Sequence, residues 1–311
     1  MKEIKLTEIE GFRIGHAENQ EGMTGCTVML FDACTPAGVD VRGGGPASRE
    51  TPLLNPVMDA KGIHGILLSG GSAFGLDAAG GVMKYLEERG IGFDVGITKV
   101  PLVCQSSLFD LMVGDMTIRP DAAMGYAACL DADDPDTVPE TKGAVGAGLG
   151  CTVGKYRGPE FCMPSGLGSY AVSMGDLQVG ALVAVNALGD IYDPETNKKL
   201  AGVKGADGKL LASPLSYFDA AYEQAPSFSG NTTLGIIVTN AEFEKTALNK
   251  IASMAHNGYA AAIRPVHTMA DGDSIYAVST GKVKGDINLI GPLAAYVMGR
   301  AIADAAKSVQ Q

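Results

Sequence analysis

Residues 229–238 read Ser-Gly-Asn-Thr-Thr-Leu-Gly-Ile-Ile-Val, a polar turn that passes directly into an apolar strand. Glycine and asparagine tolerate left-handed backbone, and threonine is common at the start of strands, so we predict a turn followed by a strand at 234–238. Helical periodicity at 242–261, an alternating strand at 274–279 and an amphipathic helix at 294–306 complete this part of the chain. The chain after Asn231 therefore predicts a compact β-α-β-α block.

The longer N-terminal part alternates short apolar runs with polar or glycine-rich tracts. The unbroken apolar run at 177–187 indicates a strand buried on both faces, and the helix that we predict at 72–89 has Phe74 on its apolar face. The other predicted strands are 27–31, 39–41 and 63–68, the polar loops are 131–142 and 193–214, and the glycine-rich turn is 143–154. This order favours stacked sheets with helices outside them, a layered α/β protein.

Composition limits the class of protein further. The chain has 311 residues and a net charge of −11, with 46% hydrophobic and 19% charged residues, which excludes a disordered protein. The negative charge disfavours nucleic acid and anionic membrane surfaces as partners. The six cysteines form no C-x-x-C pair, and no run of 18 uncharged apolar residues predicts a membrane span. Because the first residues lack the apolar core of a secretion signal, we expect a soluble, cytoplasmic protein.

The junction between Asn231 and Thr232 has three interpretations. It is a turn entering the strand, or an Asn-x-Thr glycosylation acceptor, which the missing signal peptide disfavours. The third is self-cleavage, in which the Thr232 hydroxyl takes over the acyl group of Asn231 and hydrolysis of that ester frees Thr232 as an N-terminal residue. Its α-amine, with an ordinary pKa of about 8, could then deprotonate its own hydroxyl.

Other polar residues could support such chemistry, although each also has a structural interpretation. Asp271 and Asp273 suit a hairpin turn, but in an extended segment they project to one face, where two carboxylates need a cation such as an N-terminal ammonium. Asn186, at the end of an apolar strand, is either a hydrogen-bonded core amide or an oxyanion donor. Lys155 follows the glycine-rich turn and could equally be a surface charge.

Two further patterns are weaker. The stretch 70–75, Gly-Gly-Ser-Ala-Phe-Gly, precedes a predicted helix but matches neither G-x-G-x-x-G nor a P-loop, which favours close helix–strand packing over nucleotide binding. The histidines lack zinc-binding spacing, although His267 with Asp271 and Asp273 could form a metal site. A Ser-His-Asp triad is compatible with the composition, but no G-x-S-x-G elbow is present.

Taken together, these segments resemble the self-processing N-terminal-nucleophile hydrolases that include the L-aminopeptidase/D-esterase, the β-peptidyl aminopeptidases and the nylon-oligomer (6-aminohexanoate oligomer) endohydrolase. The resemblance extends over some 250 residues, and several motifs in the same order carry it. These motifs are 22–28 (GMTGCTV), 41–44 (VRGG), 70–76 (GGSAFGL), 145–148 (VGAG), 230–233 (GNTT), 237–240 (IVTN) and 267–278 (HTMADGDSIYAV).

The resemblance implies a four-layer αββα sandwich formed by residues 1–311 as one hydrolase domain. It implies cleavage between Asn231 and Thr232 into a 1–231 α chain and a 232–311 β chain that stay associated, commonly in a homo-oligomer, a tetramer of processed protomers. A threonine after asparagine is more similar to the nylon-oligomer hydrolase than to the aminopeptidases, whose nucleophile is serine.

The same resemblance implies the site residues. Thr232 corresponds to the nucleophile, Lys155 to the active-site lysine, Asn186 to the active-site asparagine, and Asp271 and Asp273 to the paired acidic residues. The family's active-site tyrosine falls on Phe109, which has no hydroxyl to donate.

We therefore expect an amide-bond hydrolase with a small peptide or amide substrate, and we find no sequence sign of a metal or other cofactor. The sequence does not distinguish α-peptides, β-peptides, D-amino-acid amides, esters and nylon-like oligomers. One alternative is an acyl transferase like the ornithine acetyltransferases, although the Lys-Gly-Thr-Met context of their threonine is missing. Another is a non-catalytic binding protein that keeps the fold without processing.

Overall fold

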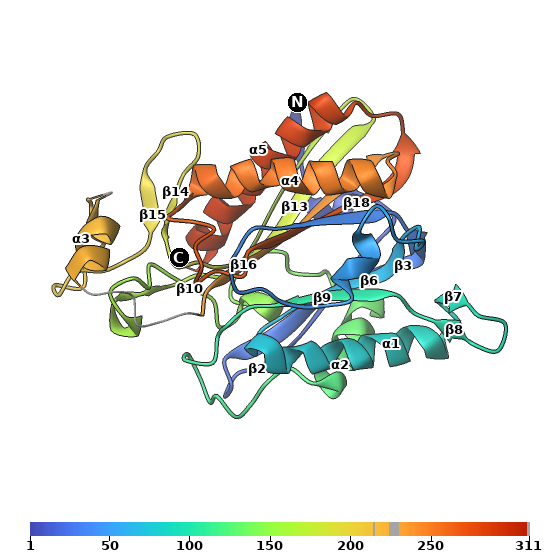
Figure 1. The fold of residues 1–311 in the computed structure, drawn as a ribbon, viewed down its shortest axis with the longest axis horizontal. Coiled ribbons are helices and arrows are strands. Elements are labelled where there is room, and N and C mark those ends of the chain that lie inside the picture. The colour runs from blue at the N-terminus through green and yellow to red at the C-terminus, as the bar shows by residue number, and fades with distance from the viewer. Residues whose placement is uncertain (214, 224–229, 310–311) are drawn as a thin grey trace.

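Two β-sheets face each other at the centre of the protein, as the computed structural model shows for residues 1–213, 215–223 and 230–309 (Figure 1). Ser229 of the turn before Thr232 and Pro214 of the polar loop lie outside these described residues. The larger sheet has the order β1-β12-β13-β16-β18-β4, and β16 at its centre pairs antiparallel with β13 and parallel with β18. Its strands are β1 (Lys2–Ile4), β12 (Leu167–Met174), β13 (Leu177–Asn186), β16 (Thr232–Ala241), β18 (Ser274–Val283) and β4 (Ala37–Val41).

The second sheet has the order β2-β3-β6-β9-β5, with β6 and β9 parallel and the remaining pairs antiparallel. Its strands are β2 (Arg13–Asn19), β3 (Thr24–Thr35), β6 (Ile63–Ser69), β9 (Val103–Ser107) and β5 (Ala47–Arg49). Between the sheets lies a core of buried apolar side chains, among them Phe31 and Ile66 from this sheet and Leu182 and Ile236 from the larger one.

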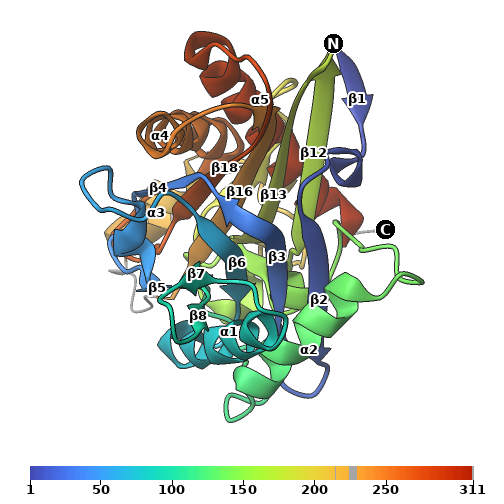
Figure 2. The ribbon, with the colours of Figure 1, turned by 90° about the vertical axis from the view of Figure 1, so that its right-hand side faces the viewer.

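Helices cover the outer face of each sheet, which gives four layers (Figure 2). Helices α4 (Lys245–Ala262) and α5 (Ile287–Ser308) share a core with the larger sheet, and α1 (Ala78–Glu88) and α2 (Ala122–Asp133) share one with the smaller sheet. The layered α/β fold and the αββα order implied by the resemblance are therefore confirmed.

The remaining elements are short and lie at the ends of this sandwich. They are α3 (Ser216–Glu223), the hairpin β7 (Phe93–Asp94) and β8 (Lys99–Val100), the pair β10 (Thr152–Val153) and β11 (Met163–Pro164), and the small sheet of β15 (Lys199–Ala201), β14 (Asp190–Tyr192) and β17 (Ile263–Arg264). The 3-10 turns are η1 (Leu6–Glu8), η2 (Thr51–Leu54), η3 (Ser72–Asp77), η4 (Gly146–Gly148) and η5 (Pro159–Phe161).

All of the strands predicted from apolar runs are present, but several boundaries differ from the prediction. The segment predicted as one helix from Ser72 begins with the 3-10 turn η3, and Phe74 is 60% exposed beneath the Arg119 guanidinium rather than buried. Helix α2 continues to Asp133, inside the tract predicted as a polar loop, because Asp133 receives bonds from Arg13 and Tyr85. Strand β15 likewise lies inside the second predicted loop.

Helix α5 starts at Ile287, seven residues before the predicted start, with Asp286 accepting the Asn288 amide as its cap. Among the described residues it is the one helix long and apolar enough to cross a membrane by length and composition, and 61% of that apolar window is buried within the protein. Ala294, Val297 and Ala301 of α5 belong to the core under the larger sheet.

Close contact between α1 and α2 depends on glycine at position 81. A Cβ at 81 would lie 1.8 Å from the Ala122 carbonyl oxygen, whereas a Cβ at the adjacent Gly80 would find only the Ala122 Cβ, at 3.9 Å. We expect Gly81→Ala to lower the free energy of unfolding by about 1–3 kcal/mol. Gly80→Ala is the matched control and should be neutral or up to about 1 kcal/mol stabilising, because alanine favours helix. Urea unfolding of both variants measures this, and equal stabilities would contradict the packing.

Candidate active site

Thr232 is the first residue of β16 and is held from both neighbouring strands. It is the register partner of Asn186 at the end of β13, and Asn231 before it forms a parallel bridge with Asp271 just before β18. The Asn231 amide donates to the Ala270 carbonyl at 3.1 Å. Asn231 and Thr232 are both buried, so the junction lies inside the protein at the end of the central strand.

Two donors reach the carbonyl oxygen of Asn231. The Thr232 hydroxyl donates to it, and the Gly272 amide donates to it at 3.0 Å. A Cβ at position 272 would lie 2.6 Å from Thr232 Oγ1, so glycine there leaves room for the hydroxyl. The peptide carbonyl therefore accepts hydrogen bonds from a backbone N–H and from the hydroxyl of the residue that follows it.

Lys155 and Asn186 form the side of the site next to β13. The Lys155 Nζ donates to Asn186 Oδ1 at 2.6 Å and to the Asn186 carbonyl at 3.3 Å, while Asn186 Nδ2 donates to the Phe109 carbonyl at 2.7 Å. Burial lowers the pKa of Lys155 to about 8, although neighbouring acidic groups such as Asp271 oppose that effect. Lys155 is thus an ammonium that loses its proton readily near neutral pH rather than a surface charge.

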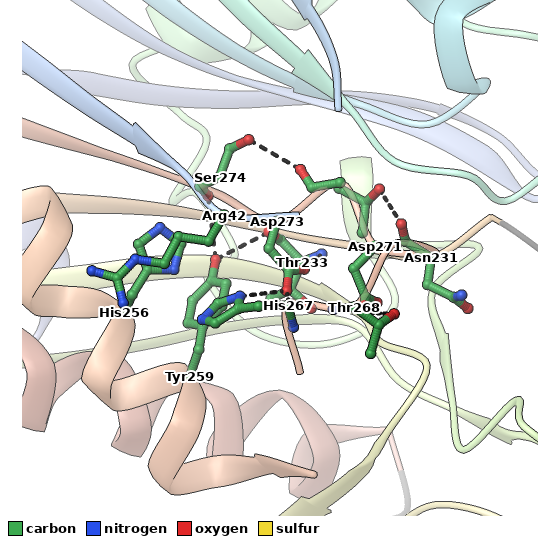
Figure 3. A network of polar contacts seen from close by, with 12 residues as sticks. Arg42, Asn231, Thr233, His256, Tyr259, His267, Thr268, Asp271, Asp273 and Ser274 are labelled. Carbon is green, nitrogen blue, oxygen red and sulfur yellow. Dashed lines mark hydrogen bonds and ion pairs between the residues drawn. The ribbon is translucent and has the colours of Figure 1, made fainter. Parts of the chain in front are cut away.

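Asp271 and Asp273 occupy the opposite side, on the loop before β18 (Figure 3). Asp273 Oδ1 accepts the Thr233 amide at 2.8 Å. Asp271 Oδ2 accepts the amide and hydroxyl of Thr268 at 2.8 and 2.6 Å. Burial and the charge of Asp273 raise the pKa of Asp271 to about 6, which these donors partly counteract.

The glycine-rich segment after β4 holds this acidic loop in place. The amides of Arg42 and Gly45 donate to the carbonyls of Asp273 and Asp271 at 2.9 and 2.8 Å, and the Gly44 amide donates to the Thr268 carbonyl at 3.2 Å. These are backbone contacts between segments more than 200 residues apart. They give a structural role to the Val-Arg-Gly-Gly motif, for which the residues alone indicated none.

The glycines at 70 and 71 lie against a buried carboxylate of the same chain, that of Asp110. The Gly71 amide donates to Asp110 Oδ1 at 2.7 Å, and Thr24 donates to Asp110 Oδ2 at 2.6 Å. Burial raises the pKa of Asp110, and both donors counteract that effect. A Cβ at Gly70 would lie 1.8 Å from Asp110 Oδ2, so glycine at this position allows close packing against the Asp110 side chain. Sequence analysis missed Asp110, since nothing in the chain places it beside Gly71.

A cavity of about 240 Å³ opens beside the junction. Gly230, Lys155 and Phe109 line it together with Asp110, Thr152 and Cys162, and its apolar wall is formed by Met112, Val113 and Pro159. The Phe109 ring occupies the wall where the resemblance places a tyrosine.

The metal site considered for His267, Asp271 and Asp273 is not assembled. His267 Nδ1 lies 2.9 Å from Asp273 Oδ2, whereas Asp271 Oδ2 is occupied by Thr268. No group of three or more His, Cys, Asp or Glu within residues 1–213, 215–223 and 230–309 could hold a metal ion.

Solved structures share this four-layer fold. The L-aminopeptidase D-Ala-esterase/amidase from Ochrobactrum anthropi, described as a variant of the N-terminal-nucleophile (Ntn) hydrolase fold, aligns with a TM-score of 0.70 over 98% of this chain and 86% of that chain at 15% identity. A Burkholderia sp. beta-aminopeptidase aligns with a TM-score of 0.65 over 96% and 85% at 20% identity. The chain belongs to peptidase family S58, whose model matches residues 5–310.

Sequence relatives agree with this assignment. An uncharacterized aminopeptidase of Mycobacterium tuberculosis is 38% identical over 295 residues, covering 89% of this chain and 82% of the relative. The 6-aminohexanoate-oligomer endohydrolase of Paenarthrobacter ureafaciens is 30% identical over 321 residues, covering 98% and 87%. The protein is therefore a hydrolase of peptide or other amide bonds, and the resemblance seen in the sequence is confirmed.

If hydrolysis requires ionised Asp271, the hydroxyl of Thr268 should influence the pH at which activity is lost on the acid side. Its hydrogen bond lowers the pKa of Asp271, so removing it in Thr268→Val raises that pKa further. We expect the acid limb of the pH profile of kcat/KM to move up by about one pH unit. Thr268→Ser keeps the hydroxyl and should keep the wild-type limb. An unchanged limb in Thr268→Val would remove Asp271 from the pH dependence.

Proposed function

We propose that this protein cleaves its own chain between Asn231 and Thr232 and then uses Thr232 as an N-terminal nucleophile on peptides or linear amides. The observation that carries the proposal is the contact of the Thr232 hydroxyl with the carbonyl of Asn231, to which the Gly272 amide also donates. Both residues of the junction are buried, so the hydroxyl competes with little water for that carbonyl.

Processing starts when Thr232 Oγ1 attacks the Asn231 carbonyl carbon. The Gly272 N–H stabilises the developing oxyanion. The proton of the attacking hydroxyl passes to the peptide nitrogen of Thr232, the C–N bond breaks, and an ester replaces the amide. Water then hydrolyses the ester. This hydrolysis yields a carboxylate at Asn231 and restores the hydroxyl of Thr232, whose α-amine the acyl shift has already freed, so that the chain is divided into 1–231 and 232–311.

Turnover repeats the same chemistry on a substrate. The α-amine of Thr232 takes the hydroxyl proton as Oγ1 attacks the substrate carbonyl, and later donates it to the leaving amine. The side-chain amide of Asn186 donates one of its two N–H groups to the Phe109 carbonyl. The second N–H, together with a backbone N–H, stabilises the oxyanion. Asp271 and Asp273 orient the amine, and Lys155 adjusts its charge through its easily lost proton.

The cavity supports a short, largely apolar acyl chain as the group that enters the site. Met112, Val113 and Pro159 offer apolar surface, and Phe109 offers a ring without a hydroxyl. Linear oligo-amides and peptides with small apolar residues fit this lining better than substrates whose binding depends on a hydroxyl at position 109.

We also propose that processed protomers assemble into a homo-oligomer, a tetramer, in the cytoplasm. The β7–β8 hairpin projects from the body, and its Phe93, Val95 and Ile97 are exposed, Ile97 by 95% (Figure 1). Apolar side chains gathered on a projecting arm favour contact with another protomer.

Thr232→Ala should remain a single chain and lose amide hydrolysis by roughly 1,000-fold or more, because it lacks the attacking hydroxyl. Thr232→Ser retains a hydroxyl, so its chain should still be cleaved. Intact mass and hydrolysis of a chromogenic amide measure both properties. If Thr232→Ala still yields fragments ending at 231 and starting at 232, another group performs the cleavage and the proposal fails.

A further inference from the structure

Asp273 connects the proposed nucleophile to a histidine. One carboxylate oxygen, Oδ1, accepts the Thr233 amide at 2.8 Å. The other, Oδ2, accepts the His267 backbone amide at 3.1 Å and lies 2.9 Å from the Nδ1 of the His267 ring (Figure 3). The carboxylate is buried, so these bonds determine where it points.

The tautomer of His267 follows from its surroundings. Its Nε2 is buried and has no hydrogen-bond partner among the described residues, whereas Nδ1 faces the carboxylate. The neutral ring with hydrogen on Nδ1 satisfies this arrangement, because Nε2 then needs no acceptor. His267 therefore donates to Asp273.

Helix α4 fixes the ring of His267 from the other side. The Tyr259 ring stacks on it with centroids 5.8 Å apart and an interplanar angle of 22°, and the His256 ring meets it edge-on at 4.7 Å. The Tyr259 hydroxyl also donates to the Thr233 carbonyl at 3.1 Å, so the same helix holds both the imidazole and the start of β16.

The ionisable groups around this contact leave His267 as the donor to Asp273 Oδ2. Burial lowers the pKa of His256 to about 4, so its ring is neutral near pH 7, and its Nε2 donates to the Asp40 carbonyl at 3.0 Å. Tyr259 remains protonated, since burial raises the pKa of its phenol. Arg42 donates to Asp40 and Ser253, and Asp271 carries the same charge as Asp273.

We propose that His267 is a positioning residue for processing and turnover: its Nδ1–H holds the Asp273 carboxylate aimed at the amide of Thr233, which in turn places the amine of Thr232. This inference rests on the proposed function, because it assigns the support of that nucleophile. It requires a hydrogen-bond donor at the Nδ1 position and does not require a positive charge on the ring.

His267→Asn and His267→Asp form a matched pair that tests for the donor. His267 has φ of 59°, in the left-handed region that asparagine and aspartate both tolerate. Asparagine can place an N–H at the position of Nδ1, whereas aspartate places an oxygen there and repels Asp273. We expect His267→Asn to process and turn over within about threefold of wild type. His267→Asp should lose at least about tenfold in processing rate and kcat, with the acid limb of kcat moved to higher pH.

His267→Gly is a second variant that also suits the left-handed backbone and removes the donor without adding charge. It should lose activity and regain part of it when imidazole is added. Thermal unfolding of all three variants identifies those that are folded.

The inference is overturned if folded His267→Asp matches wild type in rate and pH profile. It is also overturned if folded His267→Asn loses as much processing rate and kcat as His267→Asp. The same holds if folded His267→Gly keeps the wild-type activity or if added imidazole does not raise its activity. In each case, the proposed function is still supported if the wild-type chain is cleaved and the Thr232→Ala chain is not. A wild type that neither divides nor hydrolyses amides would end the proposed function itself.

Discussion

The hydrogen bond from the Thr232 hydroxyl to the carbonyl of the preceding residue is the interaction on which the site depends. It exists because β16 is held on both sides from its first residue, by β13 through Asn186 and by the segment before β18 through Asp271 and Gly272. A surface turn with the same sequence would sample many geometries. At the centre of a six-stranded sheet the junction is held by both neighbouring strands, and Tyr259 of helix α4 on the outer face donates to the Thr233 carbonyl.

Charge burial is the second constraint. Lys155, Asp110, Asp271 and Asp273 are all buried within or beside the site, and burying an ion is costly unless hydrogen bonds replace its water. Backbone amides and hydroxyls, such as those of Thr268 and Gly71, supply those bonds to Asp271 and Asp110. Lys155 instead donates to the side-chain and backbone oxygens of Asn186. Burial shifts the pKa of Lys155 down to about 8 and, together with the charge of Asp273, the pKa of Asp271 up to about 6, which is the range where proton transfer is useful.

Much of the fold could be predicted from local pattern, because its strands are unbroken apolar runs such as 177–187 and 234–238. Thr232, Asn186 and Asp271 could be singled out because each stands where a polar residue meets a buried strand. The contacts that assemble the site could not be predicted from local pattern. Asp110 with Gly71, Gly45 with Asp271 and Lys155 with Asn186 join segments far apart in the chain, and no local periodicity reports such pairs. The prediction of one α-helix from Ser72 was wrong in its first turns, which are 3-10 rather than α, and Phe74 in that segment is exposed.

The central claim is that the chain is divided at one peptide bond and that the newly exposed threonine is the reactive group. N-terminal sequencing of purified wild-type protein, combined with intact mass, tests it most directly. The account predicts two chains, one ending at Asn231 and one whose first residues are Thr-Thr-Leu-Gly-Ile. A single undivided chain that hydrolyses amides at full rate would contradict it.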